Sequence, residues 1–150
     1  MAKQSAGILL YRRREGLEVF LVHPGGPIWA GKEDGAWSIP KGEFVEPEEP
    51  LDAACREFEE ETGSKISGDF TPLTPIIQKA GKKVFAWAVE GDIDASQVKS
   101  ITFEIEWPPR SGIRKSFPEV DKAAWFTASE AMSKINQRQA ALIEELQSLL

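Results

Sequence analysis

The sequence predicts an α+β fold in one domain, and three observations support that prediction. Short apolar runs separated by turn residues fill much of the chain, as expected for strands. Residues 50–62 form the clearest helical pattern. The 150 residues, of which 41% are hydrophobic and 28% charged, suffice for one domain with a buried core. We therefore expect residues 1–150 to form a single domain.

The predicted strands lie on either side of this helix. Before it, Ser5–Tyr11 and Leu17–His23 flank a charged loop that ends at Gly16, which predicts a hairpin. A turn-rich segment follows, Trp37–Pro40 predicts a brief strand, and a loop is expected from Lys41. After the helix, the strand-like runs are residues 74–80, 84–90, 101–107 and 123–126.

The helix over residues 50–62 has start and stop signals. Pro50 is tolerated in the first turn, where its missing N–H has no helical acceptor. Glu49 and Asp52 place negative charge at the positive end of the helix dipole. Gly63 follows the last helical residue and can adopt the left-handed conformation of a C-cap.

A C-terminal helical region is expected after the last strand. Thr127 and Glu130 have the spacing of a capping box, which marks a helix start. Apolar residues from Ala131 to Leu149 recur near helical spacing. This region should pack on the sheet, and a contact with a second copy is the alternative, so we expect a monomer or a homodimer.

Charge and cysteine content exclude several classes of protein. The chain has 24 acidic residues against 18 lysines and arginines, so its formal net charge is −6. Duplex nucleic acid and anionic membranes bind mainly through basic residues, and neither is an expected partner. Cys55 is the single cysteine and excludes an internal disulfide, which favours a cytoplasmic location. Nine of the acidic residues and only one arginine lie within residues 42–61, so the acidity is local.

Three glutamates of the predicted helix share one face. Glu57, Glu60 and Glu61 have i, i+3, i+4 spacing and fall within about 100° of one another around the helix axis. Like charges this close destabilise a helix unless a cation compensates them. Carboxylate oxygens suit Mg²⁺ or Mn²⁺ better than zinc or copper. The pattern indicates a divalent metal site, with a solvated acidic surface as the alternative.

The surroundings of these glutamates resemble the Nudix box, the signature of hydrolases that act on nucleoside diphosphates linked to another moiety. The resemblance covers residues 42–64, and a Pro-Lys-Gly lead-in and a later acidic loop extend it. The matching positions are Gly42, Glu48, Arg56, Glu57, Phe58, Glu60, Glu61 and Gly63, while Ser64 departs from the usual aliphatic residue. The resemblance implies the Nudix fold, a mixed β-sheet sandwiched between α-helices.

The same resemblance implies roles for the residues. Glu57, Glu60 and Glu61 would bind Mg²⁺ or Mn²⁺, together with the Gly42 carbonyl. A carboxylate must accept the proton of the attacking water, and the two candidates are Glu60 and then Glu119. Further expected roles are orientation of Glu60 by Arg56, phosphate contact by Lys41, and base contact by the tryptophans Trp29, Trp37 and Trp107.

The expected function is Mg²⁺-dependent hydrolysis of a pyrophosphate bond in a nucleotide, either a nucleoside triphosphate or a dinucleoside polyphosphate. Two alternatives are a catalytically silent domain that senses a nucleotide and an RNA 5′-end pyrophosphohydrolase. The glutamates of the box are all present in this sequence, which argues for catalysis over sensing. His23, the single histidine, is expected to be structural.

Overall fold

The computed structural model describes residues 3–150 and confirms the predicted α+β class. The strands are β1 (Gln4–Arg13), β2 (Leu17–Pro24), β3 (Lys41–Phe44), β4 (Thr71–Pro72), β5 (Ile76–Ile77), β6 (Lys83–Glu90), β7 (Thr102–Glu106), β8 (Arg114–Pro118) and β9 (Val120–Thr127). The helices are α1 (Pro50–Thr62), α2 (Ala128–Lys134) and α3 (Ala140–Leu149), with short 3₁₀ turns at Lys79–Gly81, Ala95–Gln97 and Gln137–Gln139.

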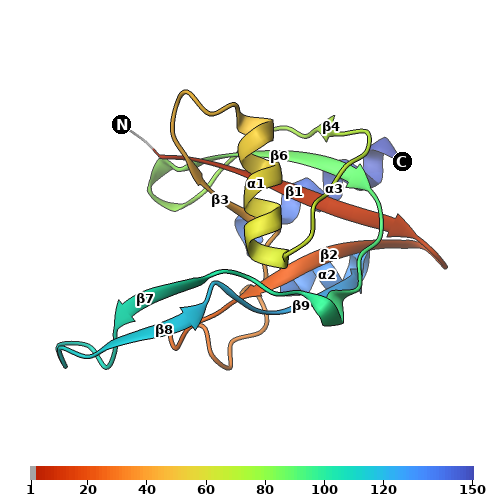
Figure 1. Cartoon of the computed structure of the whole chain (residues 1–150). Helices are drawn as coiled ribbons and strands as arrows, with labels where there is room; N and C mark the ends of the chain where they lie inside the picture. The colour runs from red at the N-terminus through yellow and green to blue at the C-terminus, as the bar shows by residue number, and fades with distance from the viewer. Residues whose placement is uncertain (1–2) are drawn as a thin grey trace.

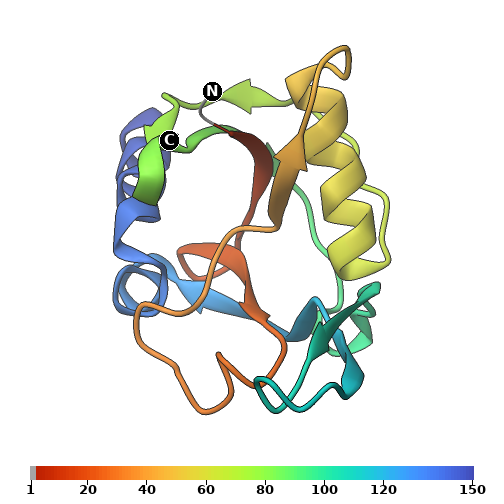
Figure 2. The ribbon, with the colours of Figure 1, turned by 90° about the vertical axis from the view of Figure 1, so that its left-hand side faces the viewer.

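Seven strands of the described chain form one mixed sheet between two helical layers. Its central order is β4-β6-β1-β2-β9, with β3 also paired to β1 and β5 to β6. The β1–β6 pair is parallel, and the other pairs are antiparallel. Helix α1 covers one face, and α2 and α3 cover the other (Figures 1 and 2). The predicted sandwich is therefore confirmed. None of the helices formed by residues 3–150 is long and apolar enough to cross a membrane.

Strand β1 changes its partner along its length, and this change opens the sheet. Its first residues pair with β3, and its last residues, from Tyr11, pair with β2. Gly7 lies at the end of the β3 pairing, where an added Cβ would stand 2.6 Å from the Cβ of Lys41. Such an overlap excludes a side chain at this position. The opening lies between the start of β3 and the end of β2.

Helix α1 has the predicted bounds and the predicted end. Gly63 is left-handed, with φ of 80°, and its N–H donates to the carbonyl of Glu59 at 2.8 Å. Ala53, Ala54 and Phe58 are fully buried on the face toward the sheet, which aligns the helix above β1. This packing fixes the direction in which the remaining faces of α1 present their carboxylates.

The strand bounds differ from the predictions where pairing is non-local or proline intervenes. Of residues 74–80, only Ile76–Ile77 pair with β6, because Pro75 lacks an N–H and a 3₁₀ turn starts at Lys79. Residues 37–40 form only isolated bridges, at Trp37 and Ser38. The predicted loop at Lys41 is instead β3, which pairs with the start of β1.

Strands β7 and β8 form a separate two-stranded hairpin, named here the arm (residues 102–118). The arm extends away from the sandwich below α1 in Figure 1. The sequence predicts β7 but not β8, because residues 114–118 lack the apolar alternation of a strand.

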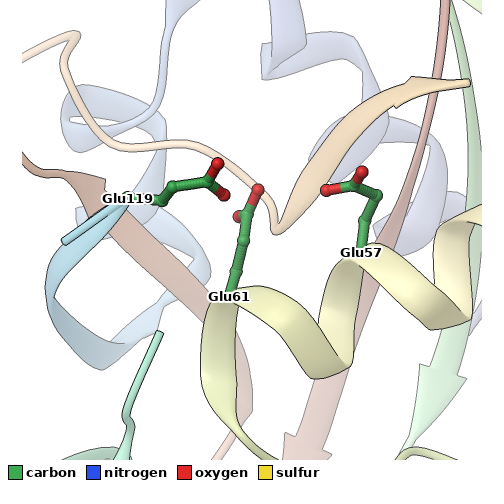
Figure 3. A group of neighbouring side chains, drawn as sticks. All are labelled: Glu57, Glu61 and Glu119. Atoms are coloured by element: carbon green, nitrogen blue, oxygen red, sulfur yellow. The ribbon is translucent and has the colours of Figure 1, made fainter. Parts of the chain in front are cut away.

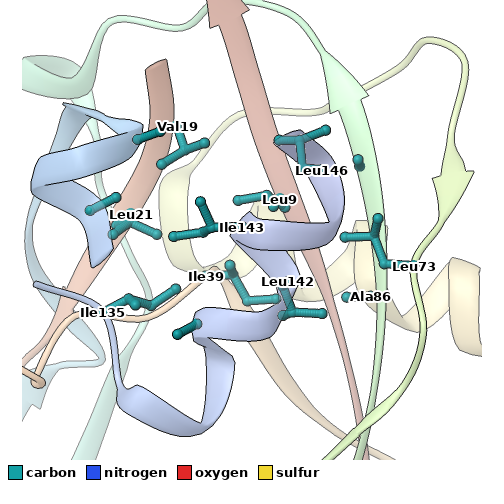
Figure 4. Packing of buried hydrophobic residues seen from close by; sticks show 14 of the residues in the cluster. Leu9, Val19, Leu21, Ile39, Leu73, Ala86, Ile135, Leu142, Ile143 and Leu146 are labelled. Atoms are coloured by element: carbon teal, nitrogen blue, oxygen red, sulfur yellow. The ribbon is translucent and has the colours of Figure 1, made fainter. Parts of the chain in front are cut away.

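The second helical layer fills the other face of the sheet. Thr127 and Glu130 form the predicted capping box at the start of α2. In α3, Leu142, Ile143 and Leu146 are buried against side chains of β1 and β2 such as Leu9 and Leu21 (Figure 4). The apolar spacing after Thr127 therefore predicted the packing face correctly as far as Leu146, whereas Leu149 is exposed.

Truncating Leu142 tests this packing. Leu142→Ala removes a fully buried side chain and should lower the free energy of unfolding by about 2–5 kcal/mol. The matched control is Leu149→Ala, at a position that is 53% exposed in the same helix, which should cost less than about 0.5 kcal/mol in intrinsic stability. Urea unfolding followed by circular dichroism measures both, and equal losses would contradict the packing.

Candidate active site

Three carboxylates from two distant segments meet beside the opening in the sheet. Glu57 and Glu61 lie one turn apart on α1 and are both buried. Glu119 lies in the bend between β8 and β9 and faces them from the opposite side (Figure 3). One oxygen from each residue falls within 4.8 Å of the others. A single cation could contact all three side chains after small rearrangements.

Strand β3 fixes the two helix carboxylates at close range. A Cβ added to Gly42 would stand 2.1 Å from the carboxyl carbon of Glu57, so only glycine leaves room for this carboxylate. The backbone N–H of Lys41 donates to Oε1 of Glu61 at 3.3 Å. Gly42, at the start of the Nudix box, therefore leaves free the space that the carboxylate of Glu57 occupies.

Burial and mutual repulsion disfavour the charged forms of these carboxylates. Burial, followed by the charges of Glu57 and Glu119, raises the pKa of Glu61 to about 9. Burial also raises the pKa of Glu57, and burial with the charge of Glu60 raises that of Glu119. The nearby Lys41 compensates poorly, because its own burial lowers its pKa. A hard divalent cation fits this donor set, since it prefers carboxylate oxygens and would offset most of their negative charge.

Arg56 holds the acidic residues that surround this group. Its Nη1 donates to Oε1 of Glu57 and to Oε2 of Glu60, each at 2.8 Å. Its Nε and Nη2 donate to the carboxylate of Glu48 at 2.8 and 3.0 Å. The pair lowers the pKa of Glu48 and raises that of Arg56, so both remain charged. The expected contact of Arg56 with Glu60 is thus present in the structure.

Glu60 occupies a different position from the one its sequence spacing suggests. Within residues 3–150, the group of carboxylates close enough to share an ion contains Glu57, Glu61 and Glu119, without Glu60. The Glu60 side chain is engaged by Arg56 instead. Helical spacing places three glutamates on one stripe, but the close approach of β3 and of the β8–β9 bend selects two of them.

A cavity of about 590 Å³ opens beside the carboxylates. Its lining includes the three glutamates, Lys41, Gly42, Trp29, the loop from Pro24 to Ile28, and Phe103 and Ile105 of the arm. A recess of about 310 Å³ adjoins it and shares Trp29, Lys41, Glu61 and Glu119. This second recess is lined by polar side chains such as Ser38, Gln78 and Asn136.

The three tryptophans expected to contact a base have different positions. Trp29 lines both recesses and is 38% exposed. Trp37 is only 3% exposed, because its ring packs edge-on against Phe126 and His23, so the predicted base contact does not fit its position. Trp107 lies near the tip of the arm, where its backbone N–H donates to the carbonyl of Ile113.

The arm residues Phe103 and Ile105 line the cavity but were missed as candidates. Their alternation with Glu104 predicts a strand but gives no sign of which surface that strand faces.

The expected structural role of His23 is confirmed. Its buried ring contacts Oδ1 of Asp121 at 2.8 Å and the carbonyl of Lys32 at 2.6 Å.

Comparison with known proteins agrees with this fold. The NUDIX domain model matches residues 1–146, and the chain belongs to the NUDIX domain family. The box residues of the sequence predicted this family. An RNA pyrophosphohydrolase of Bartonella quintana is 42% identical over 66 residues, which cover 37% of this chain. That segment is also only 37% of the relative's own length.

Two solved structures share the fold over nearly the whole chain. The C. elegans Ap4A hydrolase in a binary complex has a TM-score of 0.65 at 19% identity, covering 97% of this chain and 96% of its own. A MutT structure, from work on Aliivibrio salmonicida and Vibrio cholerae, has a TM-score of 0.60 at 12% identity. It covers 96% of this chain and 94% of its own.

Removing the charge of Glu61 should stabilise the protein when no divalent cation is present. The folded state raises the pKa of Glu61 from 4.5 to about 9, so stability falls as the pH rises between these values. Glu61→Gln is neutral throughout and should have a Tm a few degrees above wild type near pH 8 in EDTA. The difference should vanish toward pH 4.5. Scanning fluorimetry measures both, and Tm curves that coincide at all pH values would contradict the raised pKa of Glu61.

Proposed function

We propose that residues 1–150 act as one metal-dependent pyrophosphohydrolase domain for a nucleoside diphosphate linked to another moiety. The observation that carries this proposal is the group formed by Glu57, Glu61 and Glu119 at the junction of two recesses. A substrate of this class has a different group on each side of the bond that is split. Two recesses that meet at the carboxylates offer space for both groups.

The carboxylates of Glu57 and Glu61 would hold Mg²⁺ or Mn²⁺, with the Gly42 carbonyl as a further donor implied by the family resemblance. A bound divalent ion neutralises phosphate oxygens and lowers the pKa of water. The tight fit between Gly42 and Glu57 supports this assignment, because it fixes the donor atoms before an ion arrives. Arg56 orients Glu57 and also Glu60 through its hydrogen bonds.

Glu119 is the general base in this proposal. It faces α1 across the cavity, and burial and the charge of Glu60 raise its pKa, which makes the carboxylate a stronger proton acceptor. Glu60, the other candidate from the sequence, accepts a hydrogen bond from Nη1 of Arg56, so one of its oxygens is already engaged. Glu60 is therefore assigned a positioning role.

Lys41 would contact a phosphate, since its side chain lines both recesses between the carboxylates and the opening. Burial lowers the pKa of its ammonium group, and an anionic phosphate would restore the charged form. Trp29 lines the same two recesses and offers an indole ring for stacking on a base.

Hydrolysis at an RNA 5′ end is the second candidate function. The observation that favours it is the similarity to the Bartonella quintana RNA pyrophosphohydrolase over 66 residues. The two candidates share the same chemistry at phosphorus and differ in what lies beyond the split bond. A panel that contains nucleoside triphosphates, dinucleoside polyphosphates and 5′-triphosphate RNA separates them by their kcat/KM values.

The proposed metal ligands are tested by one substitution on α1 and its matched control. With Mg²⁺ and the best substrate of the panel, Glu57→Gln should lower kcat/KM by about 10²-fold or more, because it removes a metal ligand. Glu59→Gln, an exposed position two residues along the same helix, should leave it within about twofold of wild type, as expected for a surface substitution. Turnover that persists in Glu57→Gln, or in EDTA, would refute the metal-dependent proposal.

The assignment of the base is tested by the pH dependence of kcat. Because the carboxylate form of the base is needed, wild-type activity should fall on the acidic side as Glu119 is protonated. Glu119→Gln should lower kcat by about 10²–10⁴-fold and abolish this acidic limb. Glu60→Gln should lower kcat less and retain the limb. The reverse pattern would assign the base to Glu60.

A further inference from the structure

The smaller of the two recesses beside the carboxylates is lined by three carboxamide side chains, those of Gln78, Asn136 and Gln139. A carboxamide offers a hydrogen-bond acceptor and a donor side by side. Whether it can serve a ligand depends on how far the protein already uses both groups. The hydrogen bonds within residues 3–150 distinguish the three side chains in this respect.

Two of these carboxamides are engaged in the fold itself. Oε1 of Gln139 accepts from the N–H of Ile39, and its Nε2 donates to Oγ of Ser38, both at 3.0 Å. Oδ1 of Asn136 accepts from the N–H of Arg138, also at 3.0 Å. Both ends of the Gln139 carboxamide are therefore used, and Asn136 has already used its acceptor.

The carboxamide oxygen of Gln78 differs from the other two. Oε1 is buried but has no hydrogen-bond partner within residues 3–150. In that part of the chain, Oγ of Ser5 is the only other buried side-chain nitrogen or oxygen atom with this property, and Ser5 lines neither recess. A buried acceptor without a donor costs free energy. The carboxamide turns readily about χ3, so the oxygen can meet a donor that enters the recess.

The backbone at Gln78 is held in a tight turn that leads into β6. Its N–H donates to the carbonyl of Lys82 at 2.8 Å, and its carbonyl accepts from the N–H of Gly81 at 3.1 Å. Ala80, inside the turn, has a φ of 66°, a left-handed conformation that alanine rarely adopts. The turn thus fixes where the side chain of Gln78 begins and leaves its carboxamide to adjust.

The recess joins the cavity at the proposed metal site, so a group inside it can remain attached to a phosphate at that site. Glu61, Glu119 and Trp29 line both spaces. The indole ring of Trp29 offers a surface on which a flat base can stack. A base that enters the recess has its polar edge within reach of the side chains that line it, and Gln78 is one of them.

Base edges differ in how well they match a carboxamide. Adenine presents its N6 amino group as a donor next to the N7 acceptor, and the side chain of Asn or Gln pairs with both atoms. Guanine presents two acceptors, O6 and N7, at the same edge. Oε1 of Gln78 lacks a donor, which adenine supplies and the corresponding edge of guanine does not.

We propose that Gln78 is the specificity-determining residue of this polar recess and that it selects adenine nucleotides. Its oxygen accepts from the amino group of adenine, and its NH₂ group donates to N7. This inference rests on the proposed function for the location of the diphosphate, but it concerns the choice of base and not turnover.

The base preference of the wild type is measured with ligands that cannot be hydrolysed between their phosphates. Isothermal titration calorimetry of the full chain in Mg²⁺ compares the α,β-methylene diphosphates of adenosine, guanosine and purine riboside. The purine riboside ligand lacks the amino group but keeps N7. The adenosine ligand should bind about tenfold more tightly than either of the others, as expected when a paired donor is lost.

The part of Gln78 in this preference is tested by Gln78→Met, which keeps the length of the side chain and removes both polar groups. The variant should bind the adenosine ligand about tenfold more weakly and the other two within about threefold of wild type. Its Tm should not fall, because the oxygen that is removed has no partner in the fold. Gln147→Met, at an exposed position of α3, should change none of the three affinities by more than about twofold.

Equal affinities of the wild type for the three ligands, or a preference that Gln78→Met retains, would overturn the proposal. An equal loss for all three ligands in Gln78→Met would indicate a structural role and overturn it as well. If Gln78→Met leaves binding of the 2′-deoxy form of the adenosine ligand unchanged, the oxygen serves the ribose and the proposal is wrong. The expected preference without hydrolysis of any nucleotide in the substrate panel would refute the proposed function and leave the role of Gln78 standing.

Discussion

The contact between the backbone of β3 and the carboxylates of α1 is the constraint on which the site depends. Gly42 allows the carboxylate of Glu57 to lie where a Cβ would be, and the N–H of Lys41 holds Glu61. Both contacts require β3 to separate from β2. Strand β1 permits this separation, because its first residues pair with β3 and its last residues pair with β2. Gly7 makes that exchange sterically possible. Two glycines far apart in the chain thus serve the same group of acids.

The buried acids cost stability, and the rest of the fold offsets that cost. Burial favours the neutral forms of Glu57 and Glu61, while function as metal ligands requires the charged forms. The packing of Phe58 and the two alanines of α1 on the sheet holds the helix in place regardless. Arg56 adds positive charge on the outer side of the helix, where it forms ion pairs with Glu48 and Glu60. The helix therefore separates its stabilising contacts from its chemically active face.

Local signals predicted more of this protein than non-local ones did. The bounds of α1, its left-handed cap and the capping box at Thr127 follow from residues a few positions apart, and all are confirmed. Strand β3 was missed because its pairing partner lies more than thirty residues earlier. Strand β8 was missed because a hairpin outside the main sheet needs no apolar alternation. The sequence could not predict that Trp37 is buried while Trp29 is exposed, since an indole ring suits a core and a cavity equally.

His23 couples the two sides of the cavity mechanically. One ring nitrogen contacts the loop after β2 at Lys32, and the other contacts Asp121, two residues beyond Glu119 on the chain. The backbone bond between Gly25 and Glu119 joins the same two segments a second time. Two such links at different points resist both sliding and rotation. The segment that carries Trp29 and the bend that carries Glu119 are therefore tied to each other at two points, which fixes the distance between the indole ring and the carboxylates.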